Sequence, residues 1–492
     1  MLLKKQNMKK LSILFLLSLV LFTSCKKFLD VNQTPNNPTT VPPSTILPNT
    51  TVALGFANGN DLNRATSALV QHIAGVANQT AAYDVYVLDG AFDNQWNFEL
   101  YNGAINNLQI LIDQYSTTSP AYSGVAKLEM AYAFSMATDL WGDIPYSQAG
   151  QGLKYESPRF DKVQDIYQGN STDNITSLFD LVKSGLADLD KTSVFKPSAK
   201  DDIVYAGDLT KWKRMGNSLL LKFAIQLTNV NAALAKSTIQ GVITGNNYIN
   251  ANSLDFEVPF GATVGNQNPI YSFNYVNRTG DQMMSLRFLN LEKSLNDTVR
   301  LAKLFTKPSG IFAGFDNGST AAPAALASRS QYNTYLAGTS SVGAPIRLLT
   351  NFQSNFILAE AALVLGTGTA TDANNFYQAG ITAHMQKIGM TPAEISNYFA
   401  TNPTVVTLTG TPAQQLQQII TQKYIAWVGN GIEAYNDYRR TGYPVLSLVN
   451  NASGDNPNVI PTRLPYTPGE LARNPNAPNP RPKTDVKLWW AK

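Results

Sequence analysis

The sequence is poor in the side chains that most often carry out catalysis or bind metal. Its 492 residues include one cysteine, Cys25, and two histidines, His72 and His384. A single cysteine excludes an internal disulfide and any site built from several thiolates. Both histidines fall in segments expected to be helical, and neither has a partner at the spacing of a metal site or catalytic triad. We therefore interpret them as core residues.

Motifs of nucleotide-binding and hydrolytic enzymes are also missing. There is no phosphate-binding loop, no complete Gly-x-Gly-x-x-Gly and no Gly-x-Ser-x-Gly. Asp89, Asp93 and Asn94 match no standard calcium loop. Carboxylates are abundant, but nothing singles out two of them as a glycosidase pair. We therefore predict no catalytic residue, no metal ligand and no cofactor, while a surface hydrolase with unrecognised carboxylates stays open.

Net charge is low once the N-terminal segment is set aside. The chain has 38 lysines and arginines and 34 acidic residues, and four of those lysines lie within residues 1–24, which contain no acidic residue. Removing these four leaves 34 of each sign. A neutral chain has no general electrostatic attraction for nucleic acid, so no nucleic-acid partner is expected.

The N-terminus has the pattern of a secretory signal. Lysines precede a twelve-residue apolar run, Leu11 to Phe22, which is too short to span a bilayer. Thr23, Ser24 and then Cys25 follow, and this junction resembles a bacterial lipobox with Phe22 where leucine is usual. We expect residues 1–24 to be a signal peptide and Cys25 to be lipidated. An ordinary cleaved signal or a buried N-terminal helix are the alternatives.

The rest of the chain is expected to be mainly helical. Proline-rich residues 25–50 predict an extended tether, followed by a single helical domain over 51–492. Apolar residues recur every three or four positions, and paired helices with short connections favour a stacked, tetratricopeptide-like hairpin scaffold. Residues 247–280 and 306–345 predict irregular insertions, and the tail from Pro461 is rich in proline and asparagine. The expected helices lie near 62–80, 97–112, 121–140, 172–190, 217–229, 352–365, 373–387 and 413–428.

Several short segments can be explained by local structure. Gly142 and Pro145 are expected to end a helix, with Trp141 and Tyr146 packing the turn. Asp208 and Thr210 can cap the next long helix, which would place Trp212 and Leu220 in the core. Asp437, Arg439 and Arg440 predict a local ion-pair cluster.

These segments together carry a resemblance. The sequences concerned are CKKFLD (25–30), ATDLWGDIPY (137–146), YAGDLTKWKRMGNSLLLK (205–222), QKYIAW (422–427), NDYRRTGYP (436–444) and RLPY (463–466). In this order they resemble the SusD/RagB family of nutrient-binding outer-membrane lipoproteins of Bacteroidetes, over essentially the whole mature chain. The resemblance implies a tetratricopeptide-like helical fold and a lipid-anchored, surface-facing protein on the outer membrane. It also implies a SusC-like TonB-dependent transporter as partner, capture of a glycan, and no enzymatic activity.

Two stretches combine aromatic and hydrogen-bonding side chains in the way that a sugar site needs. Rings contact the C–H face of a sugar, while amides, carboxylates and arginine bind its hydroxyls. These stretches are residues 83–101 and 266–282, in regions where the family tends to bind ligand. The ligand-binding candidates are Trp96, Tyr86, Asn94, Tyr275 and Arg278. A peptide ligand within the same family, or a purely structural helical adaptor, remain alternative interpretations.

Overall fold

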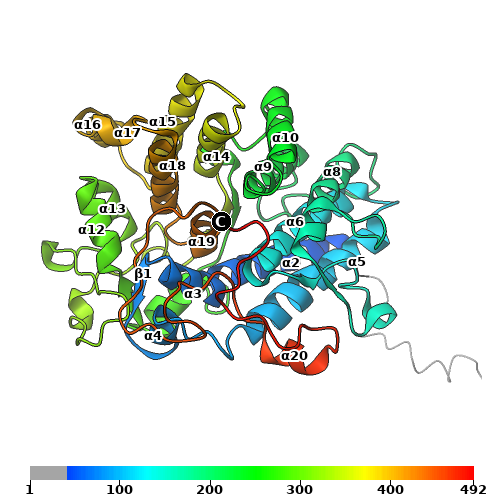
Figure 1. Ribbon diagram of the computed structural model, residues 1–492. Coiled ribbons are helices and arrows are strands. Elements are labelled where there is room, and N and C mark those ends of the chain that lie inside the picture. The colour runs from blue at the N-terminus through cyan, green and yellow to red at the C-terminus, as the bar shows by residue number, and fades with distance from the viewer. Residues whose placement is uncertain (1–40) are drawn as a thin grey trace, which may run out of the picture. The chain divides into compact units, whose positions relative to one another are not determined.

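A computed structural model describes residues 41–492, and Figure 1 shows their helices and strands. Residues 43–492 form one compact unit. The expected signal segment and Cys25 lie outside the described residues. The described chain is mainly helical with little strand, as predicted. Among residues 41–492, no helix has both the length and the apolar character needed to cross a membrane.

The first described helix, α2 (Pro43–Gly59), corrects the end of the predicted tether. The chain is helical from Pro43, although extended structure is expected through residue 50, and the helix even contains Pro48. A proline at the first helical position loses no hydrogen bond. Leu47 and Leu54 are fully buried. Burial of this apolar face therefore outweighs the low helix propensity of the two prolines.

A buried carboxyl group joins α2 to α6 (Pro120–Trp141). Glu129 lies 3.0 Å from the Thr50 hydroxyl and 2.6 Å from the Thr51 hydroxyl, and both hydroxyls also lie within 3.0 Å of the Leu47 carbonyl. Burial raises the pKa of Glu129 to about 8, against the smaller opposing effect of the threonine bonds. When Glu129 is protonated, its one O–H can donate to one threonine hydroxyl whose own proton goes to the Leu47 carbonyl, while the other threonine donates to the remaining carboxyl oxygen.

The Glu129→Gln variant is expected to show a weaker fall in stability with rising pH. The unfolded carboxyl titrates near 4.5 and the folded one near 8, so its contribution is fully present below about pH 4.5 and is lost as the pH rises to 8. The loss is about 1.4 kcal/mol per pH unit in that window. Urea unfolding of both proteins at pH 5 and pH 8 measures it. Glu156→Gln, on an exposed residue, is the control, and equal slopes for Glu129→Gln and the unmodified chain would contradict the assignment.

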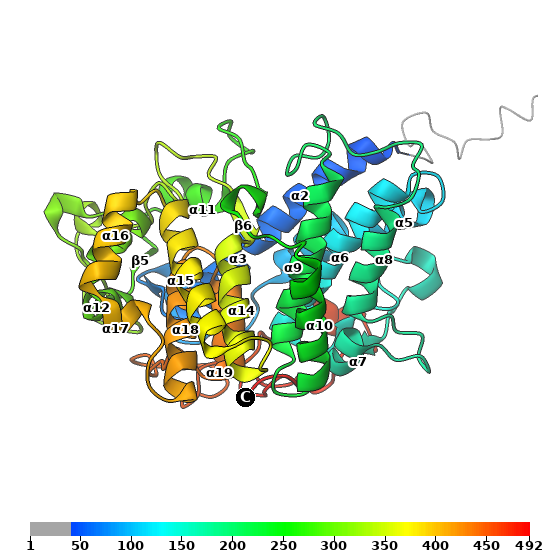
Figure 2. The same ribbon diagram turned by 90° about the horizontal axis from the view of Figure 1, so that it is seen from above.

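Packed helices form a continuous row through the molecule. Neighbours in the row contact each other in the order α5, α6, α8, α9, α14, α15, α16, and α10 packs on α9. Figure 2 shows many of these helices side by side with roughly parallel axes. The pairs α9/α10 and α14/α15 have short connections and are antiparallel hairpins. The bounds are α5 (Asn106–Tyr115), α7 (Val163–Gln168), α8 (Leu178–Asp188), α9 (Leu209–Gln226), α10 (Ala232–Gly245), α14 (Asn351–Val364), α15 (Ala370–Lys387) and α16 (Pro392–Thr401).

Side-chain caps fix where many of these helices begin. Asp208 accepts hydrogen bonds from the backbone N–H groups of Thr210 and Lys211 at the start of α9, so Asp208 caps as predicted and Thr210 serves only as a donor. Reciprocal capping boxes start α15 and α16, and a third starts α18 (Pro412–Ala426). Trp212 and Leu220 are buried, as expected.

One predicted helix has an irregular first half. The segment near 97–112 is a π-helix, η2 (Gln95–Ile105), followed directly by α5. The hydrogen bonds of a π-helix reach five residues instead of four and rotate the side chains relative to an α-helix. Phe98, an apolar residue in this segment, is accordingly 67% exposed. A second π-helix, η5, covers Ser272–Asn277.

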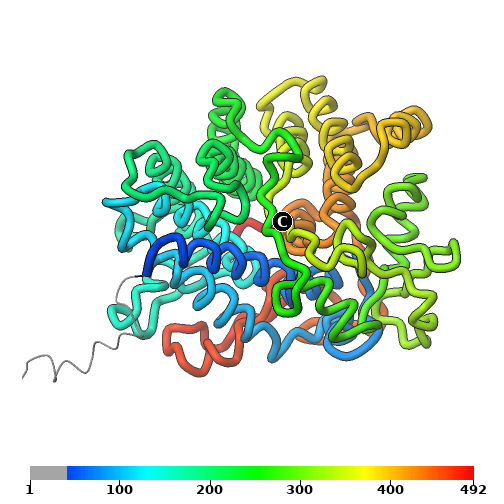
Figure 3. Tube along the Cα trace, turned by 180° about the vertical axis from the view of Figure 1, so that it is seen from behind, coloured from blue at the N-terminus to red at the C-terminus, as the bar shows by residue number. Residues whose placement is uncertain are grey.

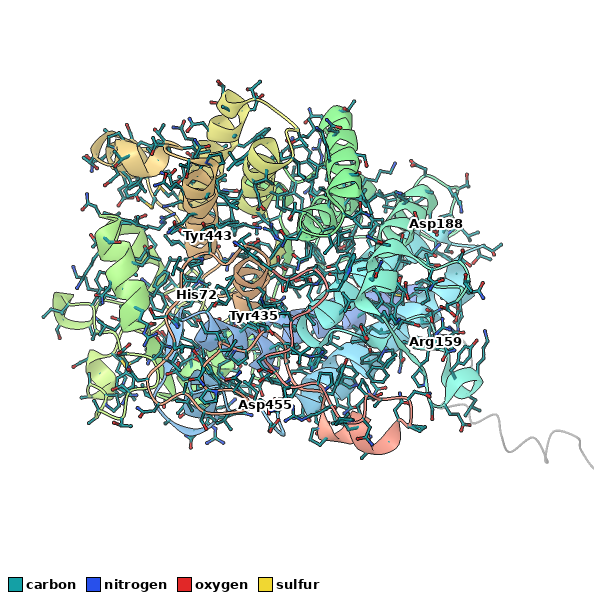
Figure 4. The ribbon with its side chains drawn as sticks, viewed as in Figure 1. His72, Arg159, Asp188, Tyr435, Tyr443 and Asp455 are labelled. Atoms are coloured by element: carbon teal, nitrogen blue, oxygen red, sulfur yellow. The ribbon has the colours of Figure 1, made fainter. Side chains whose placement is uncertain are left out.

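The helix expected near 62–80 is also interrupted. The chain forms α3 (Asp61–Leu69), then strand β1 (Ile73–Gly75) and α4 (Asn78–Asp84). Strand β1 pairs in antiparallel fashion with β5 (Gln282–Met284). This pairing and the positive φ of Gln71 break the helix. His72, which Figure 4 labels, therefore lies in a bend. His384 lies within α15, and both histidines are fully buried, as expected of core residues.

Short strands and helices lie in the two predicted insertions and in the other connections of the chain. Strand β4 pairs with β6, and β2 pairs with β3, both in antiparallel register. The remaining elements are β2 (Ile144–Pro145), β3 (Phe160–Asp161), β4 (Phe256–Val258), β6 (Ile346–Leu349), α11 (Pro269–Tyr271), α12 (Leu286–Ser294), α13 (Thr298–Leu304), α17 (Pro403–Val406), α19 (Gly431–Thr441), α20 (Pro468–Arg473), and the 3-10 turns Gly152–Tyr155, Asn252–Leu254, Pro308–Gly310 and Leu326–Ser328.

A buried charge network joins α14, α18 and α19. Arg440 pairs with Glu360 and lies 2.9 Å from Asp437, while Lys423 lies 2.9 Å from Asp437. The predicted ion-pair cluster is therefore confirmed for Asp437 and Arg440. Arg439 differs, because its guanidinium donates to the carbonyls of Asp139 and Thr462. These partners belong to α6 and the tail, which are distant in sequence.

The C-terminal tail crosses back over the helices. The Trp141 indole donates to the Pro465 carbonyl at 3.0 Å, and Arg463 donates to the Trp141 carbonyl. Trp490 is fully buried beside Arg439, 4.8 Å from guanidinium carbon to ring centroid. The proline- and asparagine-rich tail is thus mostly irregular but packed. Trp141 and Tyr146 are buried at the predicted turn, where Gly142 has a φ of 89°.

Candidate functional site

The first stretch chosen from the sequence overlaps the π-helix η2, the second contains η5, and both π-helical regions approach the same helix. A Cβ added at Gly103 of η2 would lie 3.1 Å from Ala53, and one added at Gly59 would lie 2.7 Å from Pro269 of α11. The Phe56 ring meets Phe260 edge-on at 5.3 Å. Figure 3 shows the green segment that contains α11 crossing close to the blue helix α2. Both stretches therefore lie against α2, and π-helical turns are frequent at functional sites.

A polar cluster follows the end of α2, and we call Asn60, Asp61, Arg64, Gln95 and Glu99 the Asn60–Glu99 cluster. Glu99 accepts hydrogen bonds from the side chains of Asn60 at 2.7 Å and Gln95 at 3.4 Å. Burial is the largest effect on Glu99 and raises its pKa to about 7, although the Asn60 bond opposes it. Near neutral pH this carboxyl therefore exists in both forms and can accept or donate a hydrogen bond.

Arg64 links the two stretches. It pairs with Asp61 and lies 3.4 Å from the Gln79 amide oxygen. Its guanidinium carbon is 3.6 Å from the centroid of the Phe273 ring, on η5, and 6.0 Å from that of Tyr83. A small recess beside it is also lined by Phe273 and Asn274. Arg64 is nearly buried, and its contacts with Phe273 and Tyr83 hold the two stretches together.

Two tyrosines form an aromatic platform on the second stretch. The Tyr271 and Tyr275 rings stack at 5.6 Å with planes 14° apart, and both are partly exposed. The Tyr275 hydroxyl donates to the Tyr332 carbonyl at 2.6 Å. Asn268 caps α11 by accepting from the backbone N–H groups of Ile270 and Tyr271. The platform is therefore held in place before any ligand arrives.

Two of the predicted ligand residues belong to the core, which corrects that part of the interpretation. Trp96 is 2% exposed, meets Trp141 edge-on at 5.0 Å and donates to Glu470 at 3.3 Å. Tyr86 is 1% exposed, and its hydroxyl accepts from the Val449 N–H at 3.2 Å. A ring buried to this extent has no free face for a sugar. We therefore remove Trp96 and Tyr86 from the candidate site.

The remaining predicted residues are accessible but are not all joined. Tyr275 is partly exposed, whereas Asn94 and Arg278 are exposed. Within residues 41–492, no hydrogen bond or ring contact connects Asn94 with Tyr275 or Arg278. Sequence reasoning missed Asn60, Arg64 and Glu99 as site residues. The polar run from Asn60 to Arg64 at a helix start was the available signal.

The described residues contain no group of three or more histidine, cysteine, aspartate or glutamate side chains arranged to hold a metal ion. The Nε2 of His72 lies 3.0 Å from the Tyr424 carbonyl oxygen, and burial lowers the pKa of His72 to about 3. Since a carbonyl oxygen accepts, the ring nitrogen donates in this contact.

The Asn60–Glu99 cluster and the tyrosine platform together offer a binding surface for ligand rings that have apolar faces and hydrogen-bonding rims.

Solved structures share the fold across nearly the whole chain. A chitin-binding protein is 24% identical, with a TM-score of 0.76, covering 91% of this chain and 99% of its own. A SusD homologue from Bacteroides uniformis is 23% identical, with a TM-score of 0.72 and coverage of 92% and 98%. A chitin-binding SusD homologue from Flavobacterium johnsoniae is 21% identical, with a TM-score of 0.72 and coverage of 91% and 97%.

A comparison with curated proteins finds no match. A family model does match, over residues 35–467, and its description is starch-binding associating with outer membrane. The match spans the helical row, the candidate site and the buried charge network. This chain therefore belongs to the SusD-like family.

Proposed function

We propose that this protein captures a glycan at the outer surface of the outer membrane and delivers it to a SusC-like TonB-dependent transporter. Membership of a family described as starch-binding and outer-membrane-associated supports the glycan and the location. The chitin-binding proteins of the same fold make a neutral polysaccharide the first choice of ligand. The role consists of binding and transfer, without covalent chemistry.

The tyrosine platform beside the Asn60–Glu99 cluster carries this proposal. Stacked, partly exposed tyrosines suit the apolar face of a pyranose. Amide and carboxyl groups at the start of α3 and on η2 suit its hydroxyls, and Arg64 of this cluster packs on Phe273 of η5. Arg278 follows η5, which carries Tyr275, and its exposed side chain is available as a further hydrogen-bond donor to the ligand.

Calorimetry of the purified protein against starch and chitin oligosaccharides, with a mixed peptide digest in parallel, tests the ligand class. Micromolar-to-millimolar binding of one glycan class is the expected result. Binding confined to peptides would replace the glycan by a peptide ligand. Turnover of an oligosaccharide would contradict a role limited to capture and favour a surface hydrolase.

Membrane attachment through Cys25 is the second testable part of the proposal. The Cys25→Ala variant is expected to move from the membrane fraction to the soluble fraction, because acyl chains contribute about 0.8 kcal/mol per buried methylene to membrane binding. Fractionation and immunoblotting measure the shift. The unmodified chain, labelled with a fatty-acid analogue, is the control. A variant that still sediments with membranes would contradict anchoring through this residue.

A further inference from the structure

A second cavity lies apart from the candidate site, between α12, α15, α17 and α18. Its volume is about 420 Å³, within the range of about 300–1,000 Å³ that is typical of small-molecule sites. Its lining comes from these helices and from the turn at residues 407–411, and includes no residue of α2, η2, α11 or η5. We call it the α12–α18 pocket.

The lining of the α12–α18 pocket contains no charged side chain. Leu291, Leu295 and Val405 provide apolar surface, while threonine and glutamine side chains provide donors and acceptors. Among the described residues, the side chains of Gln417, Thr421 and Thr404 have no hydrogen-bond partner. An ionic ligand would lose its hydration here without gaining a counter-charge from the lining, so the pocket favours a neutral ligand that hydrogen-bonds.

Hydrogen bonds fix the walls of the pocket. The Gln418 amide donates to the carbonyls of Thr404 and Thr407 at 3.1 and 3.2 Å, and its oxygen accepts from the Thr409 N–H at 3.0 Å. On the opposite wall the Tyr377 hydroxyl donates to the Val405 carbonyl at 2.6 Å. These bonds hold α17 and the following turn against α15 and α18, so little ordering remains for a ligand to impose.

A buried amide in the lining of the pocket provides a donor. Gln422 is 1% exposed, lines the pocket, and accepts a hydrogen bond from Arg300 at 2.8 Å through its side-chain oxygen. Arg300 is itself fully buried and pairs with Asp297. The orientation of the Gln422 amide is thereby set, and its nitrogen keeps no partner within the described part of the chain. A buried donor of this kind gains from meeting a ligand acceptor.

We propose that the α12–α18 pocket is a separate binding site for a neutral saccharide of one or two units. The ligand class rests on the proposed function, but the location does not. Leu291 and Leu295 would face the C–H surface of the sugar. Gln417, Thr421 and the Gln422 amide nitrogen would meet its hydroxyls or its acetamido group. The site would hold a mono- or disaccharide, or the end of a longer glycan whose remaining units lie outside the pocket.

Hydrogen–deuterium exchange of the full chain with saturating maltose or N,N′-diacetylchitobiose tests the location. Protection over residues 403–422 is the expected result and supports the pocket. Protection only over 95–105 and 272–278 would support the proposed function and overturn the pocket. Protection only over 403–422 would support the pocket and count against the tyrosine platform. No protection with either sugar, or protection of 403–422 by a peptide digest alone, would overturn the pocket.

Variants then assign the affinity to the pocket. Thr421→Phe fills the space and is expected to remove the protection over 403–422. Gln417→Ala, on an exposed residue that should not affect folding, is expected to weaken binding there by roughly 2- to 10-fold, as for the loss of one hydrogen bond. Gln386→Ala on the exposed surface of α15 is the matched control. Unchanged affinity and protection in both pocket variants would overturn the assignment.

Discussion

Replacement of both platform tyrosines, Tyr271→Ala with Tyr275→Ala, is expected to weaken glycan binding by roughly 10- to 100-fold without unfolding the protein. Each aromatic contact contributes on the order of 0.5–1.5 kcal/mol beyond simple burial, so two rings account for this range. The rings are partly exposed, and no part of the buried charge network depends on them. Calorimetry with the best glycan ligand, and a thermal unfolding curve for each protein, give the two quantities needed.

Two further variants distinguish the contribution of the tyrosine rings to binding from that of the hydrogen bond that holds Tyr275 in place. Tyr275→Phe keeps the ring but loses the 2.6 Å hydrogen bond to the Tyr332 carbonyl, so most of the affinity should remain. Tyr155→Ala removes a partly exposed tyrosine from the Gly152–Tyr155 turn, outside the platform, and should leave binding unchanged. Equal affinities for the double variant and the unmodified chain would show that the glycan does not contact the platform.

Arg440→Met is expected to destabilise the fold by about 3–5 kcal/mol, the usual effect of removing one partner from a buried ion pair. Arg440 is 1% exposed and forms ion pairs with both Glu360 and Asp437. Its loss leaves the buried Glu360 carboxylate without its cation. Burial is the largest effect on the pKa of Asp437, yet Lys423 and Arg440 together hold that pKa below its usual range, so Asp437 also loses support. Denaturant unfolding of both proteins measures the change.

The matched control is a pair at the surface. Lys183 and Asp180 lie 3.3 Å apart with most of each side chain exposed, so Lys183→Met should change stability by less than about 1 kcal/mol. Adding Glu360→Gln to Arg440→Met removes the uncompensated charge and should recover part of the loss. If Arg440→Met and Lys183→Met unfold at the same denaturant concentration, the buried network contributes no special stability.

The sequence predicts helices well where apolar periodicity and capping agree. Residues 120–141 and 351–364 are long helices in both the prediction and the structure, because each has a continuous buried face. It fails at residues 43–50 and 95–105, where the conformation depends on packing between distant segments. Gly103 approaches Ala53 closely enough that η2 and α2 shape each other, and no local pattern contains that information.

In the candidate site, too, some features follow from the local sequence and others depend on packing between distant segments. Composition singled out two candidate stretches, and within them Tyr275 is partly exposed and Arg278 is exposed. It could not separate Trp96, which packs on Trp141, from a ring available to ligand, since both kinds of site favour aromatic residues. Asn60 and Glu99 come from separate helices and meet only after α2, α3 and η2 have packed.

The tail that covers Trp141 and Arg439 has a consequence for biosynthesis. Residues 461–492 leave the ribosome after every helix of the row, yet Trp490 and Arg463 complete the surroundings of residues from 139 to 141. More than 300 positions separate Trp141 from Pro465, and contacts that span such distances along a chain form slowly. Packing of the central core can therefore be completed only after every helix of the row has been synthesised. Until then, a chain that lacks its last residues would leave this region open to chaperones and proteases.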